Sequence, residues 1–184
     1  MNKLFFVSFL LFLVACNSKD QKSKQELSPR EKFEQLSLLS DSLINTNPSS
    51  LNNKISLGRE IKITALKLYN NHQLDFTKVE LEFLMKCAAN GSEAAQQFKD
   101  AANYFSKAQK RFPNSKNSPA YLHNKARILD DILNDKNNAR IAYEDLINLY
   151  PEHPLSKNAS IYLKNAFGKS EEELLNLINN SSSN

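Results

Sequence analysis

"ARIAYEDLINLYPEHP", residues 139–154, contains the pattern that decides the fold of this 184-residue chain. Its apolar side chains recur every three or four residues until Tyr150-Pro151, as expected for an amphipathic helix that ends at a proline. A similar helix ends at Phe112-Pro113, 38 residues earlier. The other matches across this shift are Leu84 with Leu122, Ala88 with Ala126, Ala101 with Ala139 and Phe105 with Tyr143. The chain therefore carries a tandem helical repeat.

In each repeat, small side chains allow two antiparallel helices to approach, large ones fill the space between them, and a proline starts the turn to the next pair. This pattern resembles the tetratricopeptide repeat. Both units depart from its usual spacing of about 34 residues by an added residue between the helices and a longer turn between repeats. More narrowly, residues 84–178 resemble small tetratricopeptide-repeat lipoproteins of Bacteroidota, on the stretches "FSKAQKRFPNSKNSPAYLHNKARIL", "ARIAYEDLINLYPEHP" and "AFGKSEEELLNLI". The resemblance implies a scaffold whose concave helical face holds a partner peptide or protein.

The region before the repeat is also predicted to be helical, although it matches the family only in helical character. Ser28 and Glu31 form a capping box that opens a helix ending before Asn47-Pro48. A second helix carries Gly58 on its apolar stripe, so we expect a neighbouring backbone to pass close by. Thr77 and Glu80 form another capping box, and Gly91 is expected to stop the helix that this box opens.

Four further helices are predicted within residues 92–112, 121–133, 139–149 and 155–167, the last closed by Gly168. Ser170 and Glu173 cap a short final helix. The expected fold is all-α, an antiparallel helix-hairpin array of the tetratricopeptide type with about seven to eight helices. Its parts are an N-terminal helical hairpin at 28–75, the repeats at 76–180 and a disordered tail at 181–184.

The first residues predict how the protein reaches its compartment. Lys3 precedes an apolar run, Leu4 to Val14, that is too short to span a membrane but suits a secretion signal. Leu13-Val14-Ala15-Cys16 resembles a bacterial lipobox, in which the cysteine is acylated and becomes the new N-terminus. The prediction is a signal peptide at 1–15 and a flexible tether at 16–27 with lipid on Cys16, which anchors the chain to the membrane.

The location is predicted from the residue after the acylated cysteine. In enterobacterial lipoproteins an Asp in that position favours the inner membrane, and here it is Asn17. The acid-rich stretch of surface-exported lipoproteins is missing. The resemblance therefore implies the outer membrane, with the periplasmic face favoured over the cell surface.

Cys87, the only other cysteine, lies in an apolar helical run and is expected in the core.

The composition offers little material for catalysis. His72, His123 and His153 are far apart, and no metal-binding or nucleophile motif occurs, so no enzyme activity, metal or cofactor is predicted. The acidic run 171–173 starts a helix, where negative charge offsets the helix dipole. The net charge is +4, and the densest group of basic residues is Lys107, Lys110, Arg111 and Lys116. Aromatic residues do not alternate with these basic residues, as they would in a nucleic-acid site. The group is therefore predicted to be a solvated helix face.

These observations favour a lipid-anchored periplasmic scaffold that binds unidentified envelope proteins, in outer-membrane assembly or in wall and division processes. A lipoprotein that binds a small ligand or a peptidoglycan fragment between its first three helices stays open as an alternative. A deep apolar pocket with convergent polar groups would favour the ligand. An open groove lined by exposed Tyr, Asn and Lys would favour the scaffold.

Overall fold

The computed structural model describes residues 26–45, 50–170, 172–173 and 175–176. These residues contain α-helices and short helical turns and no strand. The elements, in chain order, are α1 (Pro29–Asn45), α2 (Leu51–Asn71), the 3-10 turn η2 (Gln73–Asp75), α3 (Lys78–Ala94), α4 (Phe98–Arg111), α5 (Ser118–Arg127), the π turn η3 (Ile128–Ile132), α6 (Lys136–Leu149) and α7 (Pro154–Asn165). The predicted all-α array of about seven to eight helices is confirmed.

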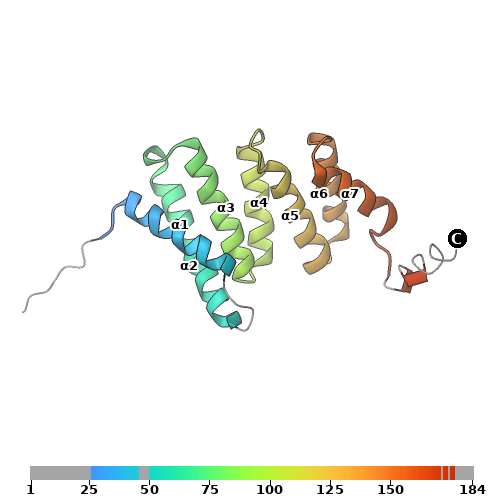
Figure 1. The fold of residues 1–184 in the computed structure, drawn as a ribbon, viewed down its shortest axis with the longest axis horizontal. Helices are drawn as coiled ribbons and strands as arrows, with labels where there is room; N and C mark the ends of the chain where they lie inside the picture. The colour runs from blue at the N-terminus through green and yellow to red at the C-terminus, as the bar shows by residue number, and fades with distance from the viewer. Residues whose placement is uncertain (1–25, 46–49, 171, 174, 177–184) are drawn as a thin grey trace, which may run out of the picture.

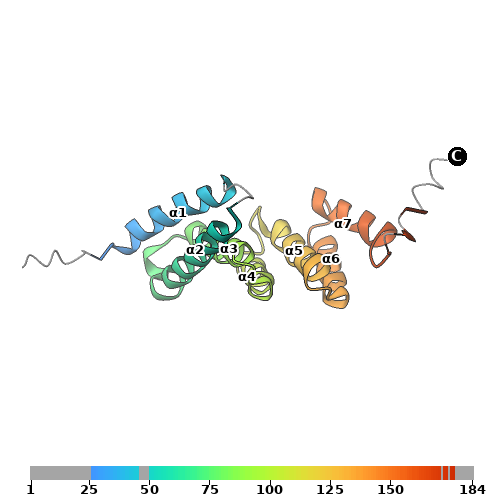
Figure 2. The same ribbon diagram turned by 90° about the horizontal axis from the view of Figure 1, so that it is seen from below.

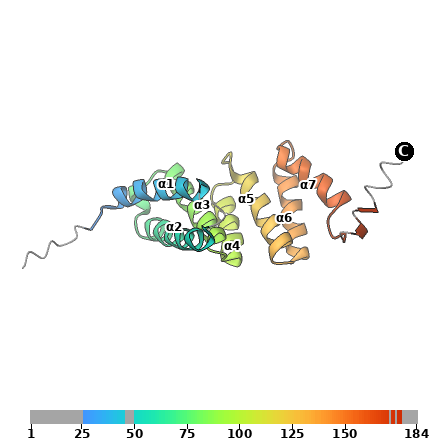
Figure 3. The same ribbon diagram turned by 60° about the horizontal axis from the view of Figure 1, so that its bottom comes forward.

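The helices form one elongated row in which each packs against the next along the chain (Figure 1). Seen from below, α1 and α7 lie on one side of the row, with α2 and α4 on the other (Figure 2). The first and last helices, α1 and α7, lie towards opposite ends (Figure 3). The predicted signal peptide 1–15, the tether with Cys16 up to residue 25, and the tail 181–184 lie outside the described residues.

The repeat determines the positions of buried side chains. Ala101 of α4 and Ala139 of α6 are fully buried, and Phe105 and Tyr143 are buried one helical turn later. The bounds of α4 and α6 also match across the 38-residue shift. The two helices therefore take equivalent places in successive hairpins, as the sequence predicted.

The first hairpin repeats part of this pattern, although the sequence showed only its helical character. Ala65 of α2 is fully buried like Ala101, and Phe76 closes the hairpin as Phe112 does after α4. Ala65 and Phe76 belong to a core cluster formed by α1, α2 and α3, whereas Ala101 and Phe112 belong to a second cluster that runs from α3 to α7. The N-terminal hairpin thus continues the same packing scheme.

The prediction that Gly91 ends its helix is wrong. α3 continues through Gly91 to Ala94, and the turn into α4 is made at Gln96, whose φ is 59°. A Cβ on Gly91 would lie 2.7 Å from the carbonyl oxygen of Gly58, and one on Gly58 would lie 2.7 Å from that of Gly91. The two glycines therefore allow the backbones of α2 and α3 to touch, which confirms the close approach expected at Gly58.

The predicted capping boxes are present. Thr77 accepts a hydrogen bond from the Glu80 amide, and the Glu80 carboxylate accepts from the Thr77 amide at 2.8 Å. The Ser28 and Ser170 amides donate in the same way to Glu31 at 2.8 Å and to Glu173 at 2.6 Å. Each box satisfies backbone N–H groups that a helix start would leave without partners.

Two other predicted boundaries differ in detail. The helix expected at 121–133 is α5 followed by the π turn at Ile128–Ile132. A π turn takes one more residue than an α turn, so it accounts for one residue of the excess over the usual spacing. α7 ends at Asn165, before Phe167, and Gly168 follows with a φ of 76°.

Candidate binding groove

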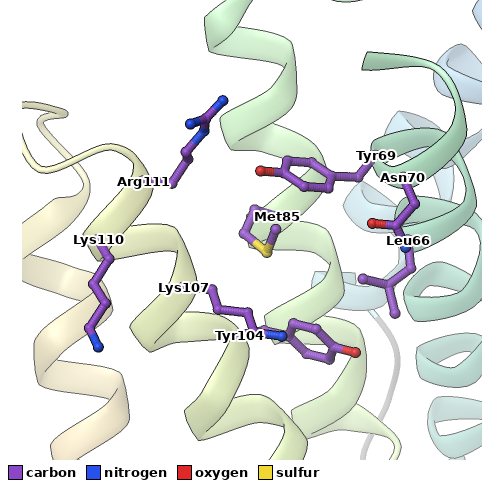
Figure 4. A pocket seen from close by; sticks show the side chains of 8 residues that line it. All are labelled: Leu66, Tyr69, Asn70, Met85, Tyr104, Lys107, Lys110 and Arg111. Atoms are coloured by element: carbon purple, nitrogen blue, oxygen red, sulfur yellow. The ribbon is translucent and has the colours of Figure 1, made fainter.

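A groove of about 460 Å³ lies between α2, α3 and α4. Figure 4 shows the side chains that line it. They are Leu66, Tyr69 and Asn70 from α2, Met85 from α3, and Tyr104, Lys107, Lys110 and Arg111 from α4. We call this surface the tyrosine–lysine groove.

Helical spacing brings these residues to one surface. Tyr104, Lys107 and Arg111 follow one another at intervals of three and four, so they lie on one face of α4. Phe105 and Ala108, which are buried in the core, lie on the adjoining face of α4. The groove therefore lies beside the core, between α2 and α4, with α3 between them.

The floor of the groove is apolar and its walls are aromatic. Met85 is 5% exposed, and the half-buried rings of Tyr69 and Tyr104 lie on either side of it (Figure 4). The Lys107 ammonium lies 5.3 Å from the centre of the Tyr104 ring, a cation–π arrangement. A thioether between two aromatic rings suits an apolar side chain from a ligand.

An ion pair joins the helices at one end of the groove. Lys62 of α2 lies 2.6 Å from the Asp100 carboxylate of α4, and it also donates to Gln97 at 2.9 Å. The Lys62 side chain is 15% exposed, so this pair is better shielded than an ordinary surface contact. The pair links the two walls of the groove.

The other end is positively charged. Among the described residues, no ion pair involves Lys107, Lys110 or Arg111. The segment 101–116 contains no acidic residue. Lys110 and Arg111 end α4, where cations also interact favourably with the helix dipole. The rim therefore presents cations that form no ion pair with a described carboxylate.

The sequence predicted a plain solvated face for these basic residues. All four are exposed, but three of them line a groove, while Lys116 lies beyond the end of α4 and outside it. The missed signal was Tyr104, three residues before Lys107 on the same face. The other wall could not be foreseen, because Tyr69 lies on a different helix.

A second cavity of about 450 Å³ lies between α1 and α2, near the place proposed for a ligand. Its apolar residues include Leu36 and Leu68, and it carries charges of both signs. One pair, Lys32 with Glu26, lies 2.7 Å apart. Since its charges are mixed, this cavity has no single electrostatic preference.

Cys16 lies outside the described residues, so its acylation stays a prediction. Cys87 is fully buried, and burial raises the pKa of its thiol to about 11, which confirms its assignment to the core. No helix in the described ranges is long and apolar enough to cross a membrane.

The three histidines lie at separate places. The His72 ring Nδ1 lies 3.2 Å from the Asp75 carboxylate, and His123 packs against Tyr143, where burial lowers its pKa. The His153 ring accepts a hydrogen bond from the Leu155 amide and so caps α7. Within the described part of the chain, no three potential ligands gather as a metal site.

Two buried or half-buried carboxylates that the sequence did not single out tie the helices together. Glu82 of α3 accepts hydrogen bonds from Ser115, Asn117 and Tyr121 at 2.5, 2.9 and 2.7 Å. Burial alone would raise the Glu82 pKa, but these bonds outweigh it and the pKa is lowered.

The second of these carboxylates is that of Asp130, which lies in the π turn. Its side chain is fully buried and accepts from Lys136 at 2.5 Å and from the Tyr162 hydroxyl at 2.7 Å. Because these donors come from α6 and α7, one carboxylate links three consecutive elements. Such linkage gives these acids a structural role.

Two buried serines also repeat across the 38-residue shift. Ser118 donates to the carbonyl of Phe112, and Ser156 donates to that of Tyr150 at 2.6 Å. Ser118 begins α5 and Ser156 lies in the first turn of α7, and each bonds to the last residue before the proline that ended the preceding helix. This equivalence could have been found from the sequence.

The fold is an array of antiparallel helix hairpins, and its most distinct surface is an open, positively charged groove. The family model of the tetratricopeptide repeat matches residues 121–153, which cover most of α5, the π turn, α6 and the following turn. The match supports tetratricopeptide repeats in this chain and a scaffold for protein–protein interaction. Comparisons with curated proteins and with solved structures gave no match.

Proposed function

We propose that this chain is a non-catalytic scaffold of the bacterial cell envelope, held by lipid on Cys16 at the periplasmic face of the outer membrane. The lipid anchor rests on the sequence at Leu13-Val14-Ala15-Cys16. The scaffold role is supported by the repeat at residues 121–153. The lipid would hold the array at the membrane while the helices bind a protein of outer-membrane assembly or of wall and division processes.

The observation that carries this proposal is the character of the tyrosine–lysine groove. It is open, and Tyr69, Asn70, Tyr104 and Lys107 line it. A small-ligand site buries most of its ligand among apolar walls with a few convergent polar groups. The groove instead offers an open surface with one buried floor residue, Met85, which suits a short segment of another protein.

A lipoprotein that binds a small ligand or a peptidoglycan fragment is the second candidate. The α1–α2 cavity supports it, because its volume of about 450 Å³ is within the range of small-molecule sites. Its polar residues have both signs, so a zwitterionic fragment would suit it better than an anion.

Site-specific photocrosslinking in cells separates the two candidates. A benzophenone amino acid replaces Tyr104 in the groove, and Ile161, 61% exposed on α7, serves as the control position. The scaffold proposal expects one discrete protein adduct from position 104, abolished by Arg111→Glu, and no such adduct from position 161. Equal adducts from both positions, or none from 104, would contradict it.

Acylation has its own test. Labelled palmitate should be incorporated into the wild-type chain and not into Cys16→Ser, which should also remain unprocessed. Cys87→Ser is the matched control, because its thiol is buried and it should label normally. Normal processing of Cys16→Ser would refute the lipid anchor.

A further inference from the structure

We propose that the tyrosine–lysine groove binds an acidic peptide segment that carries an apolar side chain. This inference deepens the proposed scaffold function and depends on it. It specifies the chemistry of the partner, which neither the repeat match nor the fold defines.

Charge complementarity is the first argument. Lys107, Lys110 and Arg111 form the rim, and no ion pair to them is found in the described ranges. The nearest acidic residue on α4 towards the groove, Asp100, is already paired with Lys62. The described side chains that line the groove include no acidic residue, so the cationic rim attracts acidic groups and disfavours basic ones.

The apolar floor is the second argument. Met85 is nearly buried between the rings of Tyr69 and Tyr104, beside Leu66 (Figure 4). An apolar side chain that enters between the rings would cover the thioether and both aromatic faces. Met and Tyr are residues that protein interfaces favour. A ligand with charge alone would leave this floor exposed.

The geometry limits the length of the segment. Tyr104 and Arg111 are seven residues apart on α4, which corresponds to about 10 Å along the helix axis. An extended peptide covers that distance with roughly three or four residues. The segment therefore needs an apolar residue and at least two acidic residues within about four positions.

The orientation of the cations refines this arrangement. Lys107 and Arg111 extend from α4 on the side of the rings, whereas Lys110 points away from them (Figure 4). We therefore expect Lys107 and Arg111 to contact the acidic residues directly. Lys110 should contribute through its longer-range field and matter less.

A membrane surface and a nucleic acid are the competing occupants. An anionic bilayer would meet exposed cations but could not place lipid headgroups on a floor that lies between two rings. A nucleic acid would require basic residues along a longer track than this one-helix rim. The peptide satisfies both the rim and the floor.

The test measures fluorescence anisotropy of labelled peptides with the full chain carrying Cys16→Ser, so that no lipid contributes. The probe is GSELFEDEGS. GSKLFKRKGS reverses its charges, and GSESGEDEGS replaces its apolar pair. The three peptides are compared on the same protein, so differences in their affinity are independent of any effect of mutation on folding.

We expect each altered peptide to bind at least about tenfold more weakly than the probe. Arg111→Glu should weaken probe binding by at least about tenfold, and Lys110→Glu by less. Lys164→Glu should have no effect, and it is a matched control because Lys164 also lies in the last turn of its helix, α7. Thermal melting by circular dichroism verifies that each variant is folded.

Equal affinities for the three peptides, or equal losses for Arg111→Glu and Lys164→Glu, would overturn the inference. So would tighter binding, through Arg111, of a thymidine oligonucleotide or of vesicles containing phosphatidylglycerol. If the peptides fail while the Tyr104 crosslink still captures a protein, the scaffold function stands and only the acidic specificity is refuted. If the crosslink also fails, both are refuted.

Discussion

Substitution of Gly91 by alanine tests whether backbone contact between α2 and α3 outweighs helix propensity. In an ordinary helix interior, Gly→Ala stabilises a protein by about 0.5–1 kcal/mol. At Gly91 the new Cβ would lie 2.7 Å from the Gly58 carbonyl oxygen and 2.8 Å from the Lys62 amide nitrogen. Both are backbone atoms of α2, so neither can rotate away.

The two helices must therefore separate, and overpacking of this kind costs about 1–3 kcal/mol. We expect a net loss of about 1 kcal/mol in the free energy of unfolding, because the helix-propensity gain offsets only part of the clash. With an m-value of about 2 kcal/mol/M, the urea midpoint should fall by about 0.5 M. The assay is urea denaturation followed by circular dichroism.

Two further variants sharpen the test. Ser56→Ala, at an exposed position of α2, should stabilise the chain by a few tenths of a kcal/mol, as helix propensity alone predicts. Gly58→Ala together with Gly91→Ala should cost less than the sum of the single changes, since one separation of the helices relieves both clashes. An unchanged or higher midpoint for Gly91→Ala would refute the contact.

Three further changes test individual groups. Hydrogen bonds from Arg30 and from Thr77 lower the pKa of Glu80 to about 2. Its contribution to stability should therefore be present above about pH 4.5 and be lost as the pH falls through about 2. Glu80→Gln should lower Tm more at pH 7 than at pH 2, and a constant difference would contradict this. Burial raises the pKa of Cys87 to about 11, so Ellman's reagent at pH 8 should label it only after unfolding in urea; rapid labelling of the folded chain would disprove its burial. Asp130→Ala removes the acceptor of the Tyr162 hydroxyl and should cost about 2 kcal/mol in urea denaturation, whereas a neutral result would show that this carboxylate adds no net stability.

The parts of the fold predicted from sequence are those that local chemistry determines. The aromatic-proline pairs at Phe112 and Tyr150 indicated where α4 and α6 finish, because proline removes a backbone donor and ends a helix. The capping boxes did the same for helix starts, since their hydrogen bonds connect residues only three apart. Such signals need no knowledge of the neighbouring helices.

Tertiary contacts limited the rest. Gly91 was predicted to stop a helix because an isolated sequence does not show that another glycine, Gly58, lies across from it. The tyrosine–lysine groove was missed for a similar reason, because Tyr69 and Tyr104 become neighbours only when α2 and α4 flank α3. The basic residues themselves were found, but their apolar floor, Met85, comes from the helix between them.

The π turn at Ile128–Ile132 constrains how this repeat could change in length. Successive residues of a helix are rotated by about 100° around its axis. Deleting one residue before Asp130 would restore an ordinary α-helix, but it would also swing that carboxylate away from Lys136 and Tyr162, or else rotate the whole of α5 against its neighbours. The extra residue and the buried acid therefore depend on each other. Removing the extra residue of the π turn would require replacing Asp130 in the same step.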